Sequence, residues 1–149
     1  MDLQLKDRLS LVTGSTAGIG YAIAEALASE GARVIINGRS QESVDKATAK
    51  LAPKAAGEVL SFAGDLSEAE IAEQIAQKHP DVEILVNNLG IFEPLPFEDI
   101  PDDDWRRFFE VNVLSGVRLS RLYLPSMKDR NWGRIVFISS ESGVQYLLR

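Results

Sequence analysis

Short apolar runs alternate with amphipathic stretches along the chain. Five apolar runs predict buried strands, over Leu9–Thr13, Arg33–Asn37, Val59–Ala63, Val82–Asn87 and Arg134–Ser139. Apolar positions at helical spacing predict helices over Gly18–Glu30, Glu42–Leu51, Ser67 to about Lys78 and Asp102 to about Met127. Strands that alternate with helices are typical of βαβ units, so the pattern predicts an α/β fold with a mainly parallel sheet.

Local residues predict where several of these helices begin and end. Gly31 follows the first helix as a terminating glycine. Ser67 is the expected N-cap of the third helix, with Glu70 three residues later completing a capping box. Pro125 is expected to disturb the last turn of the long helix. The acidic run Asp102–Asp104 lies at a helix start, where negative charge faces the positive end of the helix dipole.

Composition narrows the class of protein. The 149 residues suit one domain, residues 1–149, of ordinary globular composition, with 45% hydrophobic and 26% charged residues. A net charge of −6 argues against nucleic-acid binding. The absence of cysteine excludes disulfides and thiolate chemistry, and the single histidine, His79, cannot supply a histidine-rich metal site, so no metal is expected. The start has no signal-like apolar region and no run is long enough for a membrane span, which favours a cytoplasmic protein.

A glycine-rich turn links the first strand to the first helix. Its spacing is G-x-x-x-G-x-G, and the candidate cofactor-binding residues are Gly14, Ser15, Thr16, Gly18, Ile19 and Gly20. Glycines permit a tight turn and let the backbone approach a pyrophosphate, whose charge the helix N-terminus favours. Such a loop by itself is also compatible with a purely structural turn. Its place after the first strand favours dinucleotide binding.

The end of the second strand indicates which dinucleotide. An NAD-binding fold usually has an acid there to bind the ribose 2′-hydroxyl. This chain has Gly38 at that point and Arg39 beside it. Because an arginine can pair with a 2′-phosphate, the sequence favours NADP(H), with NAD(H) the less favoured alternative.

Four further features complete a resemblance to the short-chain dehydrogenase/reductase family, over residues 7–145. Asp65 and Leu66 follow the third strand, Asn87-Asn88-Leu89-Gly90 ends the fourth, Asn112 lies in the long helix, and Ser140 follows the fifth strand in a Ser-x-x-Gly context. Leu89 departs from the alanine usual in the family. The resemblance implies a Rossmann-like, doubly wound sheet with helices on both faces. It also implies cofactor contacts from Arg39, Asp65, Leu66 and Asn87–Gly90, and catalytic roles for Ser140 and Asn112.

The resemblance implies hydride transfer between a nicotinamide and a carbonyl or alcohol carbon. In the family a tyrosine in Tyr-x-x-x-Lys is the general acid/base, and the lysine lowers its pKa. Family spacing puts that tyrosine about thirteen residues after Ser140 and so beyond Arg149, while Tyr146 comes too early and has no lysine after it. We therefore expect the C-terminal part of the fold to be missing from this chain, and the chain by itself to be catalytically incomplete.

Two structural consequences follow from the same resemblance. The fifth strand is expected to form an edge with an apolar face open to water. The long helix usually packs against a partner subunit in the family, so a homo-oligomer, dimer or tetramer, is expected for the full-length form. Phe108, Phe109, Leu119 and Leu122 are then expected to stay partly exposed in a monomer.

Three functions remain to be compared. The first is an NADP(H)-dependent oxidoreductase acting on a small carbonyl or alcohol substrate. The second is a non-catalytic dinucleotide-binding fragment or interaction module. The third, a Rossmann-like protein of another class such as a methyltransferase, is disfavoured by the combination of the loop spacing with Asn112 and Ser140. The sequence does not indicate which carbonyl or alcohol is the substrate.

Overall fold

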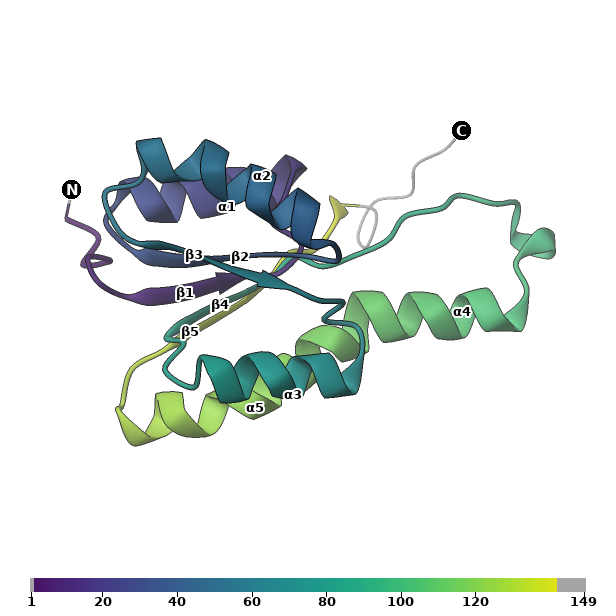
Figure 1. Cartoon of the computed structure of the whole chain (residues 1–149). Coiled ribbons are helices and arrows are strands. Elements are labelled where there is room, and N and C mark those ends of the chain that lie inside the picture. Colours follow the sequence, from purple (N-terminus) through teal and green to yellow (C-terminus); the bar gives the residue numbers. More distant parts are fainter. Residues whose placement is uncertain (1, 142–149) are drawn as a thin grey trace.

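A five-stranded parallel sheet forms the centre of the molecule (Figure 1). The computed structural model of the chain describes residues 2–141. The strands are β1 (Leu9–Val12), β2 (Arg33–Gly38), β3 (Val59–Ala63), β4 (Ile84–Asn87) and β5 (Arg134–Phe137), in the order β3-β2-β1-β4-β5. The chain moves outward from β1 to β3 and then crosses back to β4, as in a doubly wound Rossmann-like sheet. The predicted α/β fold is confirmed.

Helices cover both faces of the sheet (Figure 1). On one face lie α1 (Gly18–Ser29) and α2 (Gln41–Leu51), and on the other lie α3 (Ala69–Lys78) and α5 (Ser115–Asp129). The helix α4 (Asp102–Phe109) extends away from the sheet, and short 3₁₀ turns occupy Ala52–Lys54 and Phe97–Asp99. Within residues 2–141, no helix combines the length and the apolar character that crossing a membrane requires.

Each face of the sheet contributes to its own hydrophobic core. Val34 and Ile36 of β2 point toward α1 and α2, whereas Ile35 between them packs with Leu119 and Tyr123 on the opposite side. This alternation is the two-residue period of a strand. Because both faces are covered, β2 reads as a continuous apolar run, Arg33 and the terminal Asn37-Gly38 excepted.

The predicted capping box at the start of α3 is wrong. The helix begins at Ala69, its N-cap is Glu68, and no side chain caps it. The Ser67 hydroxyl instead donates to Asp65 Oδ1 at 2.7 Å, and the Ser67 backbone N–H donates to the same oxygen at 3.0 Å. Because the Ser67 hydroxyl is engaged in this local turn with the Asp65 carboxylate, it does not cap the helix.

The long helix is interrupted where no proline is present. Residues Glu110–Leu114 form a π-helical segment between α4 and α5. Pro125, expected to disturb the last turn, lies inside α5, which continues to Asp129. The buried side chains of Tyr123 and Met127 keep that last turn packed on the core, which offsets the backbone hydrogen bond that proline cannot make.

The exposed apolar positions only partly match the expectation. Phe109 and Leu122 are exposed and Phe108 is half-buried, but Leu119 is 1% exposed because it faces α3 and the sheet. The strand β5 is an edge of the described sheet, and the side chains of Val136 and Phe137 are exposed. The expectation of an edge strand with an apolar surface is therefore confirmed for residues 2–141.

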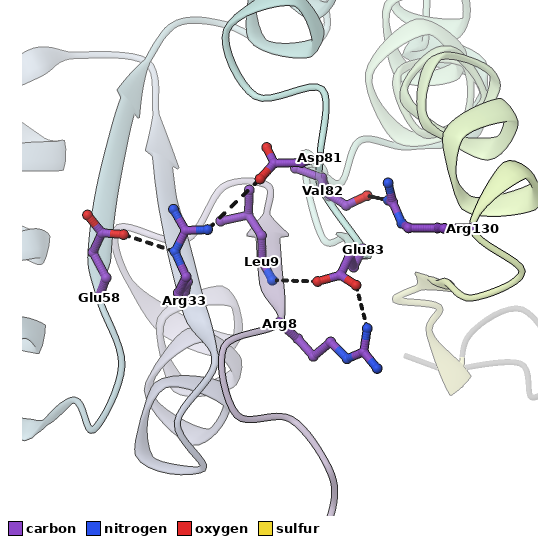
Figure 2. Close-up of polar contacts among 8 residues, drawn as sticks. All are labelled: Arg8, Leu9, Arg33, Glu58, Asp81, Val82, Glu83 and Arg130. Carbon is purple, nitrogen blue, oxygen red and sulfur yellow. Dashed lines mark hydrogen bonds and ion pairs between the residues drawn. The ribbon is translucent and has the colours of Figure 1, made fainter.

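Charged side chains tie the amino ends of the strands together (Figure 2). Arg33 pairs with Glu58 at 2.9 Å and approaches Asp81 at 3.9 Å. Glu83 accepts from the Arg8 guanidinium at 2.5 Å and from the backbone N–H of Leu9 at 3.3 Å. These contacts lie at the edge opposite the candidate residues, which follow the carboxyl ends of the strands. The charged residues at the amino edge thus link neighbouring strands and have a structural role.

Candidate functional site

The candidate residues follow the carboxyl ends of all five strands. The glycine loop follows β1, Arg39 follows β2, Asp65 follows β3, Asn88–Gly90 follow β4 and Ser140 follows β5. In a parallel sheet these ends share one edge, which is where open α/β sheets bind ligands. A hollow of about 100 Å³ lies there, lined by Gly14, Thr16, Asn37, Gly38, Arg39, Gly64, Asp65, Leu66 and Leu89.

Three glycines are required by the geometry of the loop after β1. Gly14 and Gly18 have φ of 60° and 57°, a conformation that other residues rarely adopt. A Cβ atom on Gly20 would lie 2.5 Å from both Asn88 Nδ2 and the Gly14 carbonyl oxygen. A Cβ on Gly18 would meet nothing within 4 Å, so the space above this residue is open. The loop is thus tight on its inner side and accessible on its outer side.

The N-terminus of α1 has the features of an anion-binding site. Its N-cap is Ala17, which has no side chain able to cap it, and the first turn contains no acidic residue. By contrast, the Ser40 hydroxyl of α2 accepts from the Ser43 backbone N–H at 3.3 Å. The first N–H groups of α1 and its dipole therefore face open space above the glycine loop, and a phosphate there would satisfy both. The Ile19 side chain in this first turn is exposed.

Thr13 and Asn88 join the glycine loop to the end of β4. The Thr13 hydroxyl oxygen accepts from the backbone N–H groups of Asn88 at 2.9 Å and of Leu89 at 2.8 Å. The Asn88 amide nitrogen donates to the carbonyls of Thr13 at 2.9 Å and Gly14 at 3.1 Å. The Asn88 side chain therefore supports the loop from beneath.

Asn37 joins the same loop to β2 and β3. Its Oδ1 accepts from the Gly14 N–H at 3.0 Å, and its Nδ2 donates to the carbonyls of Phe62 at 3.2 Å and Gly64 at 3.1 Å. Its backbone exchanges hydrogen bonds with Ser15, at 2.8 Å to the Ser15 N–H and 2.9 Å to the Ser15 hydroxyl. Asn37 and Thr13 are the supporting residues that sequence reasoning missed. The available signal was a polar residue at the end of each apolar strand.

The surface after β2 carries an accessible positive charge. Gly38 is buried, and a Cβ atom there would lie 2.5 Å from Thr16 Cγ2. Arg39 is exposed at the rim of the hollow, and no ion pair or hydrogen bond joins its guanidinium to the rest of residues 2–141. The first acid after β2 is Glu42, in the first turn of α2. Arg39 is therefore a cation at the mouth of the hollow with its donors available.

Asp65 and Leu66 line the hollow on the β3 side. The two hydrogen bonds from Ser67 both go to Asp65 Oδ1, so they leave the second carboxylate oxygen for other donors. Leu66 is buried in the core that α3 and α5 share with the sheet. The position of this turn thus depends on core packing on one side and on a local hydrogen-bonded turn on the other.

Asn112 lies in the π-helical segment and bridges to the loop after β4. Its Oδ1 accepts from the Ile91 N–H at 2.7 Å, and its Nδ2 donates to the Ile91 carbonyl at 3.1 Å. A Cβ on Gly90 would lie 3.2 Å from Asn112 Oδ1, so the glycine permits this close approach. Asn87 is instead buried, and its Nδ2 donates to the Ser120 hydroxyl of α5 at 3.4 Å.

Ser140 is exposed, three residues beyond the end of β5. The Ile138 N–H donates to the Asn87 carbonyl at 3.0 Å, which continues the β4–β5 pairing toward Ser140. Tyr146, which we did not expect to be the base, lies outside the described residues. The described site therefore contains the glycine loop, the three loops after β2, β3 and β4, Asn112 and Ser140.

A parallel sheet with a glycine loop at its first crossover and a hollow at its carboxyl edge defines a Rossmann-like fold. Residues 8–148 match the short chain dehydrogenase family, and the chain belongs to that family.

Relatives support the assignment. The chain is 53% identical over 145 residues to the uncharacterized oxidoreductase YvaG of Bacillus subtilis, covering 97% of this chain and 55% of that protein. It is 39% identical to a D-beta-hydroxybutyrate dehydrogenase of Cupriavidus necator, covering 94% and 55%. The chain thus spans a little over half the length of these relatives.

Solved structures show the same arrangement. L-sorbose reductase of Gluconobacter frateurii, complexed with NADPH and L-sorbose, superposes with a TM-score of 0.91 at 32% identity, over 99% of this chain and 57% of that one. An NAD⁺-bound xylitol dehydrogenase superposes with a TM-score of 0.86 at 28% identity, over 97% and 57%. Both dinucleotides therefore occur among structural neighbours.

Proposed function

We propose that residues 1–149 form the cofactor-binding domain of an NADP(H)-dependent oxidoreductase that interconverts a small carbonyl compound and its alcohol. The observation that carries the choice of cofactor is Arg39, an exposed cation at the rim of the hollow that has no hydrogen bond or ion pair to another of residues 2–141. A 2′-phosphate is a matching anion, because a guanidinium presents paired donors to phosphate oxygens. No acid stands at Gly38 to repel that phosphate or to bind a free 2′-hydroxyl.

The remaining candidate residues fit the other parts of the dinucleotide. The uncapped N-terminus of α1, with Gly14, Ser15, Thr16, Gly18, Ile19 and Gly20 around it, would bind the pyrophosphate. The second Asp65 oxygen would accept from the adenine amino group, beside Leu66. The segment Asn87–Gly90 would lie along the cofactor toward the nicotinamide. Asn88 and Asn87 would contribute through the backbone they position, since hydrogen bonds within the fold engage their side chains.

The cofactor would supply or accept the hydride, and the chain's own residues would position the reactants. Ser140 would donate a hydrogen bond to the substrate oxygen. Asn112 would fix the loop at Ile91 through its two hydrogen bonds and so keep the nicotinamide end of the groove in place. Proton transfer is the task of the family's Tyr-x-x-x-Lys motif, and we assign it to none of the candidate residues above.

Small polar carbonyls and alcohols are the favoured substrate class. Relatives in the comparison include a hydroxybutyrate dehydrogenase, and structural neighbours include a sorbose reductase and a xylitol dehydrogenase. All three names describe oxidation or reduction at a carbon bearing a hydroxyl or carbonyl group. We propose the same class here, in a cytoplasmic homo-oligomer of the full-length protein.

Titration with NADPH and NADH tests this proposal. The chain should bind NADPH more tightly than NADH, and Arg39→Gln should weaken NADPH binding by about 10- to 100-fold, the loss of a charge-assisted hydrogen bond to phosphate. NADH affinity should stay unchanged. Arg121→Gln is the matched control, because Arg121 is also exposed but lies on α5, away from the hollow. Equal loss of NADPH and NADH affinity in Arg39→Gln would contradict the assignment. Turnover by this chain alone would contradict the expectation that it is catalytically incomplete.

A further inference from the structure

Arg118 of α5 joins two parts of the candidate site that are distant in sequence. Its side chain is only 16% exposed. One nitrogen donates to the Ser67 carbonyl at 2.7 Å, and another pairs with the Glu110 carboxylate. Ser67 belongs to the turn that Asp65 closes, whereas Glu110 begins the π-helical segment. One guanidinium thus contacts both the loop after β3 and the segment that carries Asn112.

The contacts continue from Arg118 in both directions. On one side, Ser67 donates twice to Asp65 Oδ1, which orients the carboxylate at the hollow. On the other side, Asn112 lies two residues from Glu110 and binds both backbone groups of Ile91. A series of hydrogen bonds therefore runs from Asp65 to Glu110 by way of α5. The two residues of backbone from Glu110 to Asn112, within the π-helical segment, join it to the contacts at Ile91.

An arginine suits this position for a physical reason. Its planar fork can donate to a carbonyl and a carboxylate at the same time, whereas a lysine has one ammonium on a flexible stem. Glu110 is 41% exposed, so water can solvate its carboxylate if the arginine is removed. Removing Arg118 would thus break the link without leaving a buried charge.

We propose that Arg118 is a positioning residue that couples the Asp65–Ser67 turn to Asn112 and so links the adenine end of the cofactor groove to its nicotinamide end. The proposal rests on the function proposed above, because it uses the same groove. When the adenosine half of the cofactor orders the turn at Asp65, Arg118 restrains the π-helical segment, and Asn112 then restrains the Ile91 backbone. In its absence, each end of the groove responds only to the ligand that touches it.

The probe is 2′,5′-ADP, the adenosine half of NADP, which lacks the nicotinamide half that the proposal places near Ile91. Its affinity is measured by calorimetry, and its distant effect by hydrogen exchange of the Ile91 amide, the donor to Asn112 Oδ1. In the wild-type chain, saturating 2′,5′-ADP should slow exchange at Ile91. Arg118→Met should abolish that slowing and weaken 2′,5′-ADP binding by at most about tenfold, because the ligand must then order a turn that has lost one charge-assisted hydrogen bond within the protein. Arg118→Lys should restore part of the affinity but not the slowing.

Two variants keep the test decisive. Arg121→Met lies three residues further along α5, has no hydrogen bond or ion pair to the rest of residues 2–141, and should behave as wild type. Glu110→Gln retains an acceptor but removes the charge, so it should reduce the slowing even if Arg118→Met does not fold. Undiminished slowing at Ile91 in Arg118→Met, or no slowing in a wild-type chain that binds 2′,5′-ADP, would overturn the proposal. Failure of the wild-type chain to bind 2′,5′-ADP at all would instead reject the proposed function.

Discussion

Replacing Asn37 by leucine should destabilise the protein and displace the glycine loop. The Asn37 side chain is 2% exposed and makes three hydrogen bonds, to the Gly14 N–H and to the carbonyls of Phe62 and Gly64. Leucine is apolar and of similar size, so it fills the space but satisfies none of these groups. The variant therefore isolates the hydrogen bonds from the effect of a cavity.

The magnitude follows from the number of groups left without partners. A buried donor or acceptor that loses its partner costs about 1 kcal/mol or more, so three lost bonds predict a decrease of about 3 kcal/mol in the free energy of unfolding. For a chain of this size that corresponds to a fall in Tm of roughly 6–12 °C. Because stabilities of 5–15 kcal/mol are typical, we expect the variant to remain folded.

The assay is urea unfolding followed by the fluorescence of Trp105 and Trp132, together with NADPH titration of the folded protein. The midpoint should fall with an unchanged m value, and NADPH affinity should also fall, because the Gly14 N–H no longer has its anchor. Gln77→Ala, an exposed change on α3, should stay within about 0.5 kcal/mol of wild type. A loss below about 1 kcal/mol for Asn37→Leu would refute the argument that this side chain secures the loop.

Two further predictions concern buried polar groups. Burial raises the pKa of the Tyr123 phenol, and its hydroxyl has no hydrogen-bond partner among residues 2–141. Tyr123→Phe should therefore leave the free energy of unfolding unchanged or increase it by up to about 1 kcal/mol, with Tm unchanged or higher. A lower Tm would show that the hydroxyl has a partner. Desolvation, assisted by the positive charge of Lys78, lowers the pKa of His79 below its usual value of 6.5, so as the pH falls the unfolded chain takes up the proton first. The free energy of unfolding should therefore fall as pH decreases below 6.5, and His79→Gln should flatten that dependence; identical pH profiles for the two proteins would contradict it.

The fold class and the location of the site were readable from the sequence because they depend on local patterns. Apolar runs separated by amphipathic stretches predicted the parallel sheet, and β3 has the predicted bounds, Val59–Ala63. The position of the glycine loop after β1 follows from spacing alone. The positive φ of Gly14 and Gly18 is a local property of the backbone that a glycine signals in advance.

Predictions were less accurate where a side chain has more than one possible hydrogen-bonding or packing partner. Ser67 was expected to cap α3, but the Asp65 carboxylate two residues earlier takes its hydroxyl and its N–H. Leu119 is predicted to stay partly exposed in a monomer but is buried, and the phase of the helix decides whether it faces α3 or water. Pro125 is predicted to disturb the last turn of the long helix, whereas α5 continues past it and the irregularity lies at Glu110–Leu114. In each case the outcome depends on which neighbour is available in three dimensions.

Local sequence patterns specify the alternation of elements, the turn glycines and the Gly38-Arg39 pair that favours NADP(H). The contacts that support the site depend instead on how the elements pack. Asn37 and Gly14 are distant in sequence, and so are Arg118 and Ser67, and each pair meets because the sheet and helices bring their elements together. A periodic pattern records which face of an element is buried, since burial depends on hydrophobicity summed along one face. It does not record which hydrogen-bonding groups on different elements meet, because that depends on the packing of the whole chain.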